Sequence, residues 1–236
     1  MSWIVLLIAT PLLTTIGYES GIPWLLPLLQ VAPAYSVMVQ DLRRQRVGMA
    51  VLKMLFWALL IAITMETLAV YSPARGESSV IHGSAYRDEM IAWVRTGIGR
   101  ESSWRQFLPE HALHLGLFVI LSLVSGSLLS LLLGAALMNY MSYYVGSLIG
   151  IAQAPWVPLL AGWPPWAILR VGSFIVLGVN LAGPALKRYA AVPFRWEGKR
   201  AWLVLAGSGL ALDVLLKILL APKWSALLRS ALFPLS

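Results

Sequence analysis

The side chains best suited to chemistry gather in one polar segment, residues 77–114. This segment holds all three histidines of the chain, His82, His111 and His114, and five of its ten acidic residues. Imidazole and carboxylate groups are ligands for zinc or a similar divalent ion, and they also act as general acids and bases. The composition of the segment therefore predicts either a metal site or an acid/base site.

The densest cluster is the run Pro109-Glu110-His111-Ala112-Leu113-His114, which suits the start of a helix because proline is tolerated in the first turn. Glu110 and His114 are four residues apart and His111 and His114 are three apart, so all three can face the same neighbour. The run differs from the zincin motif, in which the glutamate lies between the two histidines. We predict the catalytic residues Glu89, Glu110, His111 and His114, and the metal ligands His82, His111 and His114.

Residues 84–96 are predicted to form an amphipathic helix in the membrane interface, because apolar residues recur there at helical spacing beside charged ones. If this helix starts at His82, then His82, Tyr86, Glu89 and Trp93 share one face. The predicted substrate-binding residues are Tyr86, Arg87 and, from a later span, Arg170. A purely structural role is the alternative, because a glutamate at a helix start complements the helix dipole and interfacial His and Arg are often simply solvated.

The elements that must position these residues are transmembrane helices. The chain of 236 residues is 59% hydrophobic and only 12% charged, which excludes a soluble globular protein. The absence of cysteine excludes disulfides, thiolate metal ligands and a cysteine nucleophile. We expect an all-α, polytopic transmembrane helix bundle that forms a single integral membrane domain over residues 1–236.

About seven spans are predicted, since each needs roughly 20 apolar residues. The fourth and fifth are divided near Met138–Ser142, and the fifth and sixth near Trp163-Pro164-Pro165. If the first hairpin is re-entrant, the number of spans is six. The predicted spans cover residues 3–17, 22–40, 48–71, 111–136, 141–162, 164–186 and 201–221, with a long loop at 72–110.

The charged loops predict the orientation. Loops 41–47 and 187–200 are rich in Arg and Lys and should be cytoplasmic, whereas loop 72–110 is balanced in charge and should lie outside. The net charge of +8 then reflects topology and not binding to nucleic acid. We expect a multi-pass protein of the cytoplasmic (inner) membrane.

Ionisable residues inside the predicted spans suggest a second possibility. Glu66, Arg170, Asp213 and Lys217 are costly in a membrane and often mark functional sites. Asp213 and Lys217 are spaced to neutralise each other on one helix face, and Arg170 could pair with Glu66 or reach toward water. Small residues at every fourth position (Ser122, Gly126, Ser130 and Gly134) indicate close helix packing within the bundle, or a homo-oligomer seam.

Two classes of function remain. The first is a membrane-embedded enzyme, a hydrolase or transferase that acts on a lipid or a membrane peptide at the extracytoplasmic surface. The second is a permease or an accessory subunit of a membrane complex, with a polar path through Glu66, Arg170, Asp213 and Lys217. The clustering of every histidine in one extracytoplasmic segment favours the enzyme.

Overall fold

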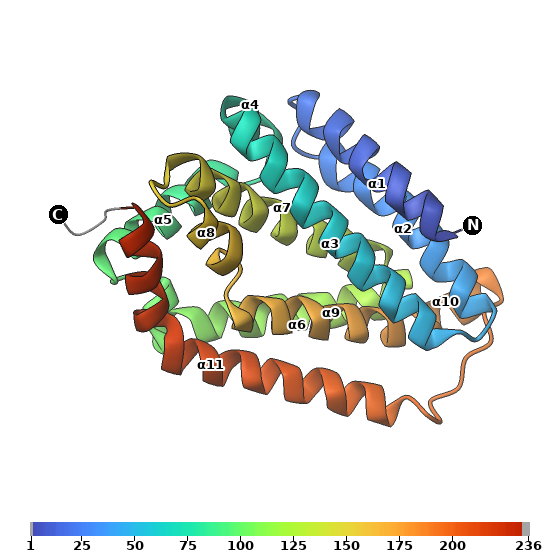
Figure 1. The fold of residues 1–236 in the computed structure, drawn as a ribbon. Helices are drawn as coiled ribbons and strands as arrows, with labels where there is room; N and C mark the ends of the chain where they lie inside the picture. The colour runs from blue at the N-terminus through green and yellow to red at the C-terminus, as the bar shows by residue number, and fades with distance from the viewer. Residues whose placement is uncertain (1, 233–236) are drawn as a thin grey trace.

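The computed structural model describes residues 2–232, and this part of the chain folds into α-helices joined by short turns (Figure 1). The helices are α1 (Ser2–Glu19), α2 (Leu25–Arg43), α3 (Val47–Tyr71), α4 (Pro73–Ser79), α5 (Gly83–Thr96), the 3-10 helix η1 (Arg100–Ser102), α6 (Trp104–Ser125), α7 (Leu128–Ile151), α8 (Trp156–Ala161), α9 (Pro165–Leu181), α10 (Gly183–Ala190) and α11 (Arg200–Leu232). The prediction of an all-α chain is confirmed for these residues.

Six segments of residues 2–232 are long and apolar enough to cross a membrane: α1, α3, α6, α7, α11 and the stretch Trp156–Leu181 that contains α8 and α9. Their outward faces remain apolar, as Leu113 and Ile120 on α6 and Leu215 and Leu219 on α11 show by their exposure. This pattern supports a multi-pass membrane protein. The predicted span 22–40 corresponds to α2, which carries Gln30 and Asp41 on its buried side and is less apolar than the six candidate spans.

The predicted break near Met138–Ser142 is wrong, because α7 runs through it without interruption. The chain turns instead at Gly126 and Ser127, which have φ values of 60° and 70°. Glycine adopts this left-handed conformation easily, and the hydroxyl of Ser127 compensates by donating a hydrogen bond of 2.6 Å to the carbonyl of Gly178. The predicted spans 111–136 and 141–162 are therefore replaced by α6 and α7, and each boundary moves toward the N-terminus by a third to a half of a helix.

The small-residue stripe is divided by the same turn. Ser122 lies near the end of α6 and Ser130 near the start of α7, and the hydroxyl of Ser122 donates to that of Ser130 at 2.8 Å. The stripe is therefore not one face of a single helix, as the sequence suggested. It closes the α6–α7 hairpin.

The helices at 83–96 and at the C-terminus pack on each other. Met90, Trp93 and Val94 of α5 are buried, so an apolar face of this helix packs on the bundle, and its location in the membrane interface stays a prediction. α11 continues past its predicted end and contains Pro222, and Figure 1 shows the helix bend in its C-terminal part. Beyond the predicted end, Arg229 donates to the carbonyl of Val94 at 2.9 Å.

The long loop and the two basic loops lie at different ends of the bundle, as the predicted orientation requires. Figure 1 shows α4, α5, α8 and the end of α11 gathered at one end, and α10 with the α2–α3 turn at the other. The long loop 72–110 and the two basic loops therefore lie at opposite ends of the helices. The candidate site lies at the end formed by α5.

Candidate functional site

A cavity of about 320 Å³ penetrates the bundle from the α5 end, between α3, α5, α6, α7, α9 and α11. Its outer part is polar, and its deep part is apolar. The polar lining consists of Tyr86, Glu89, Arg100, Glu101, Glu110, His111, His114, Tyr140, Arg170, Asp213 and Lys217. The deep lining consists mainly of Trp57, Ala58, Leu115, Phe118, Leu131, Gly134, Met138, Phe174 and Ile175.

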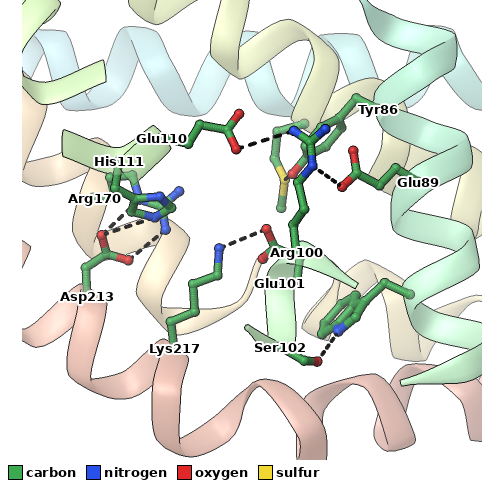
Figure 2. Close-up of polar contacts among 12 residues, drawn as sticks. Tyr86, Glu89, Arg100, Glu101, Ser102, Glu110, His111, Arg170, Asp213 and Lys217 are labelled. Carbon is green, nitrogen blue, oxygen red and sulfur yellow. Dashed lines mark hydrogen bonds and ion pairs between the residues drawn. The ribbon is translucent and has the colours of Figure 1, made fainter. Parts of the chain in front are cut away.

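Arg170 and Asp213 form the central ion pair of the polar part, as Figure 2 shows. The guanidinium of Arg170 donates twice to the carboxylate, with Nε 2.9 Å from Oδ2 and Nη2 2.8 Å from Oδ1. Asp213 is only 1% exposed, so its charge depends on this two-pronged contact for compensation. The pair joins α9 to α11 and corrects the expectation that Arg170 pairs with Glu66.

His111 lies beside this pair. Its Nε2 is 4.0 Å from Oδ2 of Asp213, beyond hydrogen-bond distance, and it is buried without a hydrogen-bond partner among the residues that the structure describes. The ring packs against Phe107, with 5.2 Å between the ring centroids. A buried nitrogen of this kind is available to a bound molecule, as an acceptor when the imidazole is neutral.

Lys217 pairs with Glu101 and not with Asp213, although Asp213 precedes it by one helical turn. Its Nζ is 2.8 Å from Oε1 of Glu101 and lies 4.4 Å from the centroid of the Phe107 ring. Lys217 is 1% exposed, so the carboxylate and the ring face replace its hydration. The i, i+4 spacing was misleading because Arg170 already occupies the carboxylate of Asp213.

Arg100 bridges the two acids at the mouth of the cavity. Its Nε is 3.1 Å from Glu89 and its Nη1 is 3.6 Å from Glu110, and all three side chains remain about half exposed. Figure 2 shows this bridge above the Lys217–Glu101 pair. The polar part thus contains four acids and three permanent cations, so it is nearly neutral and rich in both donors and acceptors.

The structure brings most of the predicted site residues to this cavity. Glu89, Glu110, His111 and His114 line it, as do Tyr86 and Arg170 of the predicted substrate-binding set. Tyr86 contacts Tyr140, with ring centroids 4.4 Å apart, and its hydroxyl lies 3.2 Å from the sulfur of Met141. Burial raises the pKa of Tyr86 well above its usual value, so the phenol stays protonated and can donate a hydrogen bond.

Two predicted residues lie elsewhere. His82 is an exposed residue with a φ of 56° that precedes α5, and it is not part of the cavity lining. Arg87 also points away from the cavity, since its guanidinium donates to Glu77, Asp88 and the hydroxyl of Tyr143. These hydrogen bonds, the one to Asp88 foremost, raise the pKa of Arg87 and give it a structural role.

The predicted zinc site is not formed by these residues. Among residues 2–232, no group of three or more His, Asp or Glu side chains lies close enough together to hold a metal ion. The physical reason is local, because the left-handed backbone at His82 ends the helical face that was to carry it toward His111 and His114. The acid/base interpretation of the cluster does not depend on His82.

Glu66, predicted to lie on a polar path, contacts a residue of the cavity, and three further residues of the site were not predicted. The carboxylate of Glu66 accepts a hydrogen bond from Nε1 of Trp163, which itself lines the cavity. Sequence analysis did not single out Arg100, Glu101 or Phe107. The signal available for the first two was their position in the charged segment 77–114, but nothing in the spacing showed which helix they would meet.

No protein-family model, curated protein or solved structure matches this chain, so the candidate site is defined by its own geometry.

Proposed function

We propose that the chain is a membrane-embedded enzyme, a hydrolase or transferase, that acts on a lipid or a membrane-anchored peptide at the extracytoplasmic side of the cytoplasmic membrane. The observation that carries the proposal is the division of one cavity into a charged outer part and an apolar deep part. A substrate with a polar head and a hydrocarbon chain matches both parts at once. Pockets that bind small molecules commonly combine an apolar wall with a few converging polar groups.

The depth of the cavity suits one lipid chain. On α6 its lining extends from Phe107 to Phe118, and at 1.5 Å per residue this stretch measures about 16 Å. One leaflet of a bilayer has a hydrocarbon thickness of about 15 Å, half of the ~30 Å core. A chain that enters beside Phe107 would therefore lie alongside the hydrocarbon of its own leaflet and end near Leu131 and Ile175.

The proposed chemistry is general acid/base catalysis by His111 and Asp213. A water molecule or substrate hydroxyl between Nε2 of His111 and the carboxylate would lose its proton to one of them as it attacks an ester, amide or phosphodiester. The same group would return that proton to the oxygen or nitrogen of the bond that breaks, so the leaving group departs as an alcohol or amine. Arg170 holds the carboxylate in place through its two hydrogen bonds. Lys217 and Arg100 lie on the other side of the polar part, where they would stabilise the developing anion.

A permease or accessory subunit is the alternative, because Arg170, Asp213 and Lys217 of the proposed polar path do line one cavity. Both of its cationic members are already paired, and the lining beyond them is apolar. A transported polar solute would need a polar route to the opposite end, whereas a lipid chain needs the apolar lining that is present. The geometry therefore favours the enzyme.

The test uses the purified full-length protein in nanodiscs with a total membrane lipid extract, followed by lipid mass spectrometry. The wild-type protein should convert one lipid class, and His111→Asn should abolish the conversion. His82→Asn is the matched control, since it removes a histidine of the same segment that lies outside the cavity. Equal conversion by wild type and His111→Asn, with both proteins folded, would contradict the proposal.

A further inference from the structure

A second cavity, of about 590 Å³, lies at the opposite end of the bundle, between the α2–α3 turn, the end of α9, α10 and the loop before α11. The side chain of Gln45 donates to the carbonyl of Pro193 at 2.7 Å and so fixes this loop against the α2–α3 turn. The cavity is separate from the candidate catalytic site, and the proposed function does not use it.

The lining is positively charged. Lys187, Arg195 and Lys199 face one acid, Glu197, which lies 3.9 Å from Arg195 in a fully solvated pair. Within residues 2–232 neither Lys187 nor Lys199 has an ion-pair partner. Lys199 is half buried, and burial lowers the pKa of its ammonium group, so a bound anion would relieve its desolvation.

The inner wall offers an acceptor for a hydroxyl group. Asn180 is 1% exposed and lines the cavity, and its Nδ2 donates to the carbonyl of Val176 at 2.8 Å. Its Oδ1 is buried without a hydrogen-bond partner among the residues described here. A buried amide oxygen without a donor is unfavourable unless a ligand or water supplies one.

Aromatic rings form the third wall and place the cavity at the depth of lipid headgroups. Phe194 lines the cavity and packs directly on Gly183, where a Cβ atom would overlap its ring. Trp196, outside the lining, stands edge-on to the Phe194 ring with 4.8 Å between centroids. Trp202, in the first turn of α11, also lines the cavity. Aromatic residues concentrate at membrane interfaces, and the two basic loops mark this interface as the anionic, cytoplasmic one.

We propose that this cavity binds the phosphate of an anionic phospholipid whose headgroup carries hydroxyl groups, such as a phosphoglycerol headgroup. Lys187 and Lys199 would contact the phosphate, and a headgroup hydroxyl would donate to Oδ1 of Asn180. The lipid chains would leave the cavity past Trp202 along the apolar outer face of α11. Free glycerol phosphate presents the same chemistry without the chains, so the test includes it as a separate source.

The experiment is native mass spectrometry of the full-length protein in detergent, titrated with phosphatidylglycerol or phosphatidylcholine. We expect selective binding of phosphatidylglycerol, weakened at least tenfold by Lys187→Gln with Lys199→Gln. Arg43→Gln with Arg44→Gln is the matched control, because it removes two exposed charges from the other basic loop outside this cavity. Asn180→Leu should weaken the binding of phosphatidylglycerol more than that of phosphatidic acid, whose headgroup has no alcohol group.

Each outcome bears on the proposal. Stabilisation of the protein by inorganic phosphate or glycerol 3-phosphate, measured by thermal shift, would support the phosphate site with a soluble source. Selective binding of phosphatidylglycerol without such stabilisation would support the lipid. Equal weakening by the lysine pair and the arginine pair would show non-specific attraction to the basic end and overturn the site. Equal binding of phosphatidylcholine would also overturn it. If the double variant fails to fold, Lys187→Gln alone, at an exposed position, carries the same comparison.

Discussion

Arg170 on α9 and Asp213 on α11 form a two-pronged ion pair at the boundary between the polar and apolar parts of the main cavity. This single contact connects the two halves of the proposed site, because His111 of α6 lies 4.0 Å from the same carboxylate. Two charges that are removed from water in this way hold each other in place, and either one alone is strongly unfavourable there.

Removing one partner of this pair should destabilise the protein. We expect Arg170→Ala or Asp213→Ala to lower the free energy of unfolding by about 3–5 kcal/mol. The double variant Arg170→Met with Asp213→Leu should lower it less than either single change does. Thermal unfolding of the purified protein in detergent measures the effect. Arg75→Ala is the control, since Arg75 is 56% exposed in a 3.7 Å contact with Glu19. Variants of Arg170 and Asp213 that melt like the Arg75 control would contradict the pairing argument.

The Lys217–Glu101 contact should hold the loop after α5 against α11. Glu101→Gln removes one charge of a 2.8 Å pair in which Lys217 is fully buried, so residues 97–103 should exchange their amide hydrogens several-fold faster. Hydrogen-exchange mass spectrometry reports this directly. Glu197→Gln, in the solvated pair with Arg195, should leave exchange in its own loop unchanged. Unaltered exchange at 97–103 would mean that η1 is held by other contacts.

A pair of amides joins α2 to α7 inside the bundle. Gln30 and Asn139 exchange two hydrogen bonds of 2.8 Å each, and both side chains are buried. Gln30→Leu or Asn139→Leu alone leaves the other amide unsatisfied, so the double variant should be more stable than the sum of the singles predicts. The coupling energy should lie between about 0.6 kcal/mol, the average found between membrane helices, and about 1.7 kcal/mol, the largest value found. A double-mutant cycle on unfolding measures it, and a coupling near zero would contradict the exchange.

The sequence predicted the helical class and the polar segment because hydropathy and residue type are local properties. It missed the turn at Gly126–Ser127, since an apolar run without charge gives no signal there beyond the small residues Ser125-Gly126-Ser127 themselves. The predicted span also began at His111, whereas α6 begins at Trp104, so His111 and His114 are interior residues of this helix.

The pairing of charges was beyond sequence reasoning for a different reason. The spacing of Asp213 and Lys217 shows that they share a face of α11, but it does not show that Arg170 of α9 meets that face. Likewise, nothing local indicates that Glu101 reaches Lys217 across 116 positions. Such contacts depend on how helices pack, and the packing is set by the whole bundle.

The orientation of the bundle can be tested with single cysteines, because the native chain has none. Ser78→Cys is exposed in the long loop, whereas the neighbouring Ser79 is buried and donates to the carbonyl of Tyr18. An impermeant thiol reagent should label Ser78→Cys in intact cells and Glu197→Cys only after permeabilisation. Labelling of Glu197→Cys alone in intact cells would reverse the orientation and place the main cavity on the cytoplasmic side.

The length of the apolar part should limit the chain that the enzyme accepts. Gly134 of α7 lines the deep cavity, and a Cβ atom there would lie 3.9 Å from the ring of Phe118, so Gly134→Leu should fill the end of the cavity without moving the backbone. We expect the variant to lose activity on long-chain lipids at least tenfold and to keep it on a short-chain analogue with the same headgroup. Gly116→Leu on α6 adds the same side chain where nothing lies within 4 Å of its Cβ atom, on the exposed face of the bundle, and should leave both activities unchanged. Equal loss on long and short chains in Gly134→Leu, with His111 and Arg170 intact, would show that the substrate chain does not enter the deep cavity.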